Sequence, residues 1–137
     1  MLAELLLVED GRYLRMASKR VLADAGFGVA EATNGEDALR VARESQPDLI
    51  ILDMLLPRLG GEQVLQALRQ DPATAGIPVV VLSSLPQSNA DKLKEAGATA
   101  YLEKAKLDLA AGGENLVRVV KAALRKAQPR VAAPTLN

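Results

Sequence analysis

The segment Leu49–Asp53, with the sequence LIILD, places an aspartate directly after four apolar residues. A short apolar run of this kind is typical of a strand buried on both faces, as in a parallel sheet covered by helices. A second run, residues 5–8, is followed in the same way by Glu9 and Asp10. Functional groups of open parallel sheets gather outside the carboxyl ends of the strands. The two segments therefore predict a cluster of carboxylates at one edge of a sheet.

Strand and helix patterns alternate along the chain. The apolar segments that predict strands are residues 4–8, 27–32, 49–53, 79–83 and 99–102. The segments that predict helices are residues 12–25, a stretch that Asn34 caps, a stretch after Gly60 and Gly61, residues 89–96 and residues 114–127. Buried strands that alternate with helices favour a parallel sheet with right-handed crossovers. The expected fold is thus a doubly wound α/β sandwich.

The composition excludes several classes of protein. A chain of 137 residues, 49% apolar and 25% charged, has the size and balance of one ordinary globular domain. Its formal net charge is zero, which gives no general attraction to nucleic acid or anionic lipid. The absence of cysteine and histidine excludes disulfides and serine–histidine catalysis by this sequence alone. Without a signal-peptide pattern or a membrane-length apolar run, we expect a cytoplasmic protein with no membrane or direct nucleic-acid contact.

Polar side chains follow four of the five predicted strands. Carboxylates held close together repel one another unless a cation lies between them, so Glu9, Asp10 and Asp53 favour a bound Mg²⁺. Lys104 follows the fifth predicted strand and Ser83 ends the fourth. A fixed positive charge and a hydroxyl donor are the groups that a phosphoryl group on Asp53 would need around its oxygens.

Several short motifs occur in a characteristic order. They are Val8-Glu9-Asp10, then Asp53 with Pro57 and Gly61 behind it, then the strand ending in Ser83-Ser84, then Gly97-Ala98, and then Tyr101-Leu102-Glu103-Lys104. Each motif is weak alone, but their order and spacing give a strong signal. In these motifs the chain resembles the receiver domains of two-component response regulators, the CheY-like superfamily, over roughly residues 3–127.

The resemblance implies a fold and a chemistry. The fold would be a flavodoxin-like three-layer sandwich whose five-stranded parallel sheet has the order 2-1-3-4-5. Asp53 would accept a phosphoryl group from a phosphohistidine on a histidine kinase or histidine phosphotransfer protein. Mg²⁺ would be held by Asp10, Asp53, the backbone carbonyl of Leu55 and, through water, Glu9. The chain would assist its own phosphorylation and dephosphorylation as a regulatory domain, without being an enzyme in its own right.

The resemblance also implies a conformational switch. The hydroxyl of Ser83 would move toward the phosphoryl oxygens, the ring of Tyr101 would turn inward, and Lys104 would pair with the phosphoryl group. The surface formed by the fourth helix, fifth strand and fifth helix would then change its partners, which include a downstream protein or a missing output domain. The same surface could support a homodimer.

Three departures from the family pattern lead to further expectations. Ala105 stands where the family commonly has a proline in a cis peptide, and a cis bond before a residue other than proline costs about 2.5–4 kcal/mol. Residues 105–113 also form a longer connection than the compact version, so we expect this loop to differ in shape. Apolar residues at Leu55 and Leu85 would exclude an attacking water and favour a long-lived phosphoryl group.

Other interpretations of the sequence remain open. A flavin-binding flavodoxin is disfavoured because Glu9 and Asp10 would repel the flavin phosphate, and an aspartyl phosphatase because Leu55 replaces a second acid. The serious alternative is a pseudo-receiver, a binding module that never takes phosphate. We expect a receiver domain over residues 1–128 and a flexible tail or severed linker over residues 129–137, in a single-domain regulator or a piece of a larger protein.

Overall fold

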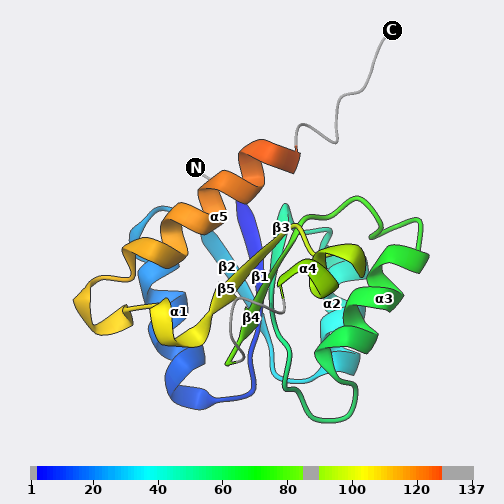
Figure 1. Cartoon of the computed structure of the whole chain (residues 1–137), viewed down its shortest axis with the longest axis horizontal. Coiled ribbons are helices and arrows are strands. Elements are labelled where there is room, and N and C mark those ends of the chain that lie inside the picture. The colour runs from blue at the N-terminus through cyan, green and yellow to red at the C-terminus, as the bar shows by residue number, and fades with distance from the viewer. Residues whose placement is uncertain (1–2, 85–89, 128–137) are drawn as a thin grey trace, which may run out of the picture.

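Five parallel strands form one sheet between two layers of helices in the computed structural model (Figure 1), which describes residues 3–84 and 90–127. The strands are β1 (Glu4–Val8), β2 (Gly28–Ala32), β3 (Leu49–Asp53), β4 (Val79–Ser83) and β5 (Ala100–Glu103). Their order in the sheet is β2-β1-β3-β4-β5, and every neighbouring pair is parallel. This order confirms the flavodoxin-like sandwich that the sequence predicts.

The helices cover both faces of the sheet. In the part of the chain that the structure describes, they are α1 (Arg12–Asp24), α2 (Gly35–Ser45), α3 (Gly61–Gln70), α4 (Ala90–Glu95) and α5 (Glu114–Ala127). Helices α1 and α5 lie on one face, and α2, α3 and α4 lie on the other (Figure 1). No helix among these described residues is long and apolar enough to cross a membrane.

Two strands begin one residue later than the sequence predicts, each for a local reason. The amide of Phe27 donates to the carbonyl of Leu22 at 3.1 Å, so Phe27 belongs to the turn that ends α1. Thr99 is joined to Val79 through both its main chain and its hydroxyl, which accepts from the Val79 amide at 3.0 Å. These two residues therefore anchor β2 and β5 from just outside the strands.

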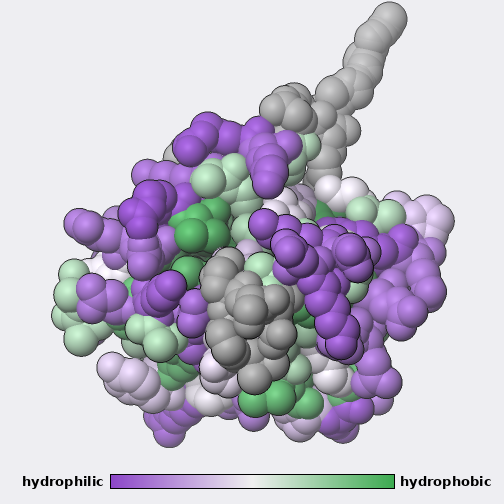
Figure 2. Space-filling view, viewed as in Figure 1, coloured by the Kyte–Doolittle hydropathy of each residue, from purple (hydrophilic) through white to green (hydrophobic). Residues whose placement is uncertain are grey.

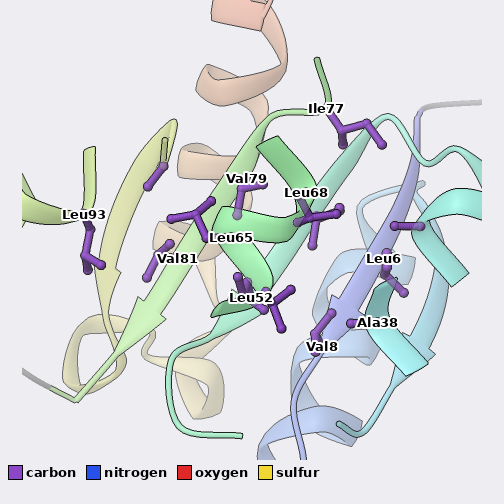
Figure 3. Close-up of a cluster of buried hydrophobic side chains, with 14 of the residues drawn as sticks. Leu6, Val8, Ala38, Leu52, Leu65, Leu68, Ile77, Val79, Val81 and Leu93 are labelled. Carbon is purple, nitrogen blue, oxygen red and sulfur yellow. The ribbon is translucent and has the colours of Figure 1, made fainter. Parts of the chain in front are cut away.

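The sheet separates two hydrophobic cores. Alternate residues of one strand point to opposite faces, so Leu6 and Val8 of β1 belong to the core with α2, α3 and α4. Figure 3 shows this core, in which Leu65 and Leu68 of α3 lie over the sheet. Leu5 and Leu7 belong instead to the core beneath α1 and α5. Burial on both faces explains the continuous apolar runs 5–8 in β1 and 49–52 in β3. The face of the molecule seen in Figure 2 is mostly hydrophilic.

The connection between β5 and α5 contains two short 3-10 helices, η2 (Lys104–Lys106) and η3 (Leu109–Ala111). Leu107, between them, is buried in the core beneath α1 and α5, and Leu109 packs against the same core. No cis peptide bond occurs among residues 3–84 and 90–127, and the Lys104–Ala105 peptide is therefore trans. The longer loop thus extends the core and begins with Lys104 in a fixed position.

Candidate functional site

The predicted carboxylates meet at the carboxyl edge of the sheet. Val8 and Leu52 are paired in the β1–β3 ladder, so the residues that follow them emerge side by side. Carboxylate oxygens of Glu9, Asp10 and Asp53 lie within 4.8 Å of one another. Glu9 and Asp53 are buried, whereas Asp10 is exposed at the mouth of the cluster. The parallel pairing of two strands thus brings together acids that are more than forty residues apart in the sequence.

Asp53 is the most enclosed member of the cluster, with 1% of its surface exposed. Its Oδ1 atom accepts a hydrogen bond from the Leu55 amide at 3.1 Å and lies 2.9 Å from the Lys104 ammonium. Leu55 itself is 69% exposed. One oxygen of Asp53 is therefore fixed by two donors, which sets the orientation of the whole carboxylate.

Glu9 is buried with an incompletely satisfied carboxylate. Its Oε2 accepts from the Gly11 amide at 3.0 Å, whereas its Oε1 lies 3.6 Å from the Lys104 ammonium and has no hydrogen-bond partner in the described structure. Burial and the neighbouring charge of Asp53 raise the pKa of Glu9. A buried acceptor without a donor is costly, and a cation at this position would satisfy it.

Lys104 provides the positive charge of the site. Burial lowers the pKa of Lys104, but the hydrogen bond and the charge of Asp53 outweigh this effect, and the net pKa is raised. Lys104 therefore remains an ammonium ion at neutral pH. Three carboxylates facing one ammonium leave the cluster negative, and oxygen-only donors are those that Mg²⁺ prefers. The residues of this edge fit a magnesium ion.

Ser83 and Tyr101, the two predicted switch residues, are both buried. Ser83 ends β4 one residue beyond the partner of Asp53 in the β3–β4 ladder, and Ser84 is exposed. Ser83, Met54 and Gly61 line a groove of about 430 Å³ beside the acid cluster. Tyr101 packs in the core next to α4, with 6% of its surface exposed. The predicted effect of Leu85 concerns a residue outside the described ranges.

Gly61 allows the loop after β3 to fold tightly behind the acid cluster. Its amide donates to the Met54 carbonyl at 3.2 Å. A Cβ atom at Gly61 would lie 2.5 Å from Met54 Cα and 2.8 Å from the Asp53 carbonyl oxygen. Both are main-chain atoms with no side chain to move away. The glycine eight residues after Asp53 is thus required by close packing of the backbone.

Arg15 is a site residue that the sequence analysis did not identify. Its Nη1 atom donates to the main-chain carbonyls of Glu9 and Asp10, each at 3.2 Å. Its Nε atom donates to Glu31 at 3.2 Å. The relevant signal is its place one turn into α1, where its side chain reaches back toward the turn that follows β1. An arginine on an amphipathic helix is so often simply solvated that its sequence position does not reveal this contact.

The fold and the acid cluster define a class of protein, the phosphoacceptor domains of the response regulator type. The chain belongs to the response regulator receiver domain family, whose model matches residues 5–110. Receiver domains of this family are regulatory, act in phosphorylation-based signalling and bind Mg²⁺ at an acidic pocket.

Individual relatives agree with this assignment. The chain is 33% identical over 105 residues to Protein PilH of Pseudomonas aeruginosa, which covers 75% of this chain and 86% of PilH. A putative response regulator from Chloroflexus aurantiacus has a solved structure with a TM-score of 0.81 and 32% identity, covering 91% of this chain and 99% of that one. Chemotaxis response regulator CheY4 of Vibrio cholerae gives a TM-score of 0.80 at 27% identity, covering 90% and 99%.

Other relatives are much longer than this chain. The Gliding motility regulatory protein of Myxococcus xanthus is 39% identical over 104 residues, which are 74% of this chain and 13% of that protein. The transcriptional regulator RpaA of a Synechocystis strain matches over 34% of its length. The relatives therefore place the same domain in proteins of very different size.

Proposed function

We propose that this chain is a phosphorylation-dependent signalling switch that accepts a phosphoryl group on Asp53 with Mg²⁺ bound. The observation that carries the proposal is the ion pair of the buried Asp53 with the partly buried Lys104, 2.9 Å apart, beside a buried Glu9 oxygen that has no hydrogen-bond partner among the described residues. Asp10 and Glu9 would hold the ion together with Asp53 and the Leu55 carbonyl. When bound, Mg²⁺ supplies positive charge that offsets the carboxylates and the incoming phosphoryl oxygens.

The transfer requires little covalent help from the domain. Because Oδ1 of Asp53 is held by Lys104 and the Leu55 amide, Oδ2 is the oxygen we assign as the nucleophile. Oδ2 forms a bond to phosphorus while the bond from phosphorus to the donor nitrogen breaks, and the leaving imidazole keeps the electron pair and takes up a proton. This sequence contains no histidine, so the phosphohistidine donor lies outside it, on a histidine kinase or phosphotransfer protein.

Switching follows if the phosphoryl group binds one conformation better than the other. Contacts from Ser83 and Lys104 to the phosphoryl oxygens would supply that difference, with Tyr101 and the α4–β5–α5 surface as the responding part. Coupling of roughly 1–3 kcal/mol is typical of such devices. The cytoplasmic location, the homodimer and the division between a receiver and a tail at residue 128 stay predictions, and residues 129–137 lie outside the described structure.

The test is the intact mass of the protein after incubation with acetyl phosphate and Mg²⁺. We expect a gain of one phosphoryl group in the wild type and in Asp24→Ala, which removes an exposed aspartate far from the cluster, and no gain in Asp53→Ala or in EDTA. Circular dichroism would confirm that Asp53→Ala is folded. A wild type that binds Mg²⁺ yet gains no mass would contradict the proposal and favour the pseudo-receiver.

A further inference from the structure

We infer that Arg15 is a positioning residue that holds the turn carrying Glu9 and Asp10 in the geometry needed to bind the metal ion. The inference rests on the proposed function, because it concerns how the same acid cluster takes up Mg²⁺. Among the described residues, Arg15 makes no hydrogen bond or ion pair with a carboxylate of the cluster. It acts through the main chain that carries the two acids.

The turn between β1 and α1 is held from several directions. The Glu9 amide donates to the Ala32 carbonyl at 3.1 Å, and the Gly11 amide donates to Glu9 Oε2 at 3.0 Å. The second bond holds the N–H of the Asp10–Gly11 peptide group, but neither bond restrains the carbonyl oxygens of Glu9 and Asp10. The Nη1 atom of Arg15 does so, because it donates to both carbonyl oxygens at 3.2 Å. Rotation of either peptide group would break one of these bonds and turn the adjacent carboxylate.

Arg15 is itself held in place. Its Nε atom donates to Oε1 of Glu31 at 3.2 Å, and the Lys19 ammonium lies 2.7 Å from Oε2 of the same carboxylate. The Arg15 side chain is only 18% exposed, compared with 46% for Lys19. Glu31 lies on β2, the strand beside β1, so the contact links the turn to the edge of the sheet. A planar guanidinium can donate to the turn and to Glu31 at the same time, whereas the ammonium of a lysine cannot match this geometry.

A supporting role and a purely electrostatic role of Arg15 predict opposite effects of its removal on metal binding. As a nearby cation, Arg15 would repel Mg²⁺, so its removal would tighten binding if charge alone mattered. As a support for the turn, its removal would loosen the acids and weaken binding. Loss of an outer contact that orients metal ligands typically costs 10–100-fold in affinity. Because the two bonds are long and go to the main chain, we expect the lower end, about tenfold.

The experiment measures the dissociation constant for Mg²⁺ by isothermal titration calorimetry on the whole chain after removal of metal with EDTA. The variants are Arg15→Ala, Arg15→Lys and Lys19→Ala. Lys19→Ala is the matched control, because it removes the same charge and a contact to the same Glu31 without touching the turn. Thermal unfolding in EDTA reports the stability of each variant, and phosphorylation by acetyl phosphate is measured across Mg²⁺ concentrations.

We expect Mg²⁺ binding to weaken about tenfold in Arg15→Ala, to weaken by a smaller factor in Arg15→Lys, and to be unchanged or slightly tighter in Lys19→Ala. At saturating Mg²⁺ the phosphorylation rate of Arg15→Ala should return to within about twofold of the wild type, since only metal occupancy is impaired. If Arg15→Ala does not fold, Arg15→Lys tests the role of Arg15 in its place. This variant keeps the charge, so a role of the charge alone would leave its affinity for Mg²⁺ unchanged.

Two failures can be told apart. If the wild type binds Mg²⁺ and takes a phosphoryl group while Arg15→Ala binds Mg²⁺ as tightly as Lys19→Ala, the role of Arg15 is overturned and the proposed function stands. If the wild type itself neither binds Mg²⁺ nor takes a phosphoryl group, both proposals are overturned.

Discussion

The ammonium of Lys104 lies 2.9 Å from Oδ1 of Asp53 and 3.6 Å from Oε1 of Glu9, so one cation pairs with two buried carboxylates, one at the end of β3 and one just after β1. Lys104 is 23% exposed at its side chain, while the two acids are almost fully covered. The two carboxylates are therefore covered by protein, whereas the lysine side chain reaches solvent. Lys104 therefore offsets part of the negative charge of the acid cluster, and it is the first residue to test.

Replacement of Lys104 by methionine keeps most of the side-chain volume and removes the charge. Breaking a fully buried ion pair costs about 3–5 kcal/mol, and partial exposure reduces this, so we expect a loss of about 2 kcal/mol in the free energy of unfolding in EDTA. Mg²⁺ should restore more stability to Lys104→Met than it adds to the wild type. Urea unfolding measures both. The control is Lys106→Met, because Lys106 is 61% exposed and pairs with Glu103 at the surface; a loss as large as that of Lys104→Met would contradict the prediction.

The pH dependence of stability should carry the signature of Glu9. Since the pKa of Glu9 is raised above its ordinary 4.5, its contribution to stability is fully present below pH 4.5 and is lost as the pH rises through the raised pKa. In EDTA, Glu9→Gln should therefore gain stability relative to the wild type as the pH rises from 4.5 to neutrality.

Glu31 provides a control of opposite sign. The hydrogen bond from Lys19 lowers the pKa of Glu31, so its contribution is present above pH 4.5 and is lost as the pH falls. Glu31→Gln should therefore be less stable than the wild type at neutral pH, and this difference should shrink as the pH falls below 4.5. Urea unfolding at several pH values tests both variants. Parallel curves for Glu9→Gln and the wild type would show that the Glu9 pKa is not raised.

Arg69 links α3 to two other segments through main-chain carbonyls. It donates twice to Gly97, at 3.0 and 2.8 Å, and once each to Ala75 and Ile77, at 3.1 and 2.7 Å. Lysine cannot reproduce this fork, so Arg69→Lys should lower the free energy of unfolding by about 2 kcal/mol. Arg43→Lys, which alters an exposed pair with Asp71, should lose less than about 1 kcal/mol. Equal losses in thermal unfolding would disprove the special role of Arg69.

The neighbouring glycines Gly60 and Gly61 should respond very differently to alanine. At Gly61 the new methyl group would meet main-chain atoms of Met54 and Asp53 at 2.5 and 2.8 Å, and overpacking of this kind costs about 1–3 kcal/mol or more. At Gly60 the nearest atom lies 3.7 Å away, so Gly60→Ala should change stability by less than about 0.5 kcal/mol. Gly61→Ala should also lower the rate of phosphorylation, because the Met54 backbone follows Asp53 directly. Unfolding and intact-mass kinetics on the two variants settle the matter.

The sheet and its edge could be predicted from the sequence because strands buried on both faces consist largely of consecutive apolar residues. Segments such as Leu49–Asp53 and Val79–Ser83 have the bounds that their apolar runs indicate. The acids that end them are close in space because parallel strands end at the same edge. Asn34 likewise caps α2 as predicted, by accepting the Asp37 amide at 2.9 Å.

Contacts that depend on geometry across the fold could not be predicted. Arg15 and Arg69 look alike on their helices, and their carbonyl partners are not encoded by any local pattern. The 3-10 turns after Lys104 were expected only as a loop of different shape, since short turns have little periodicity. The roles of Ser83 and Tyr101 in switching stay predictions, and both residues are buried in this structure.

The acidic edge of the sheet differs from the rest of the sheet in its contacts with the two helical layers. Along the strands, the sheet separates the two helical layers, and each buried strand side chain belongs to the core beneath one layer only. At the carboxyl edge of the sheet, residues from both helical layers contact the loops that carry the acids. Arg15 of α1 donates to the Glu9 carbonyl, and the Gly61 amide of α3 donates to the Met54 carbonyl in the loop after Asp53. We therefore expect a change of charge at this edge of the sheet to affect the helices on both of its faces.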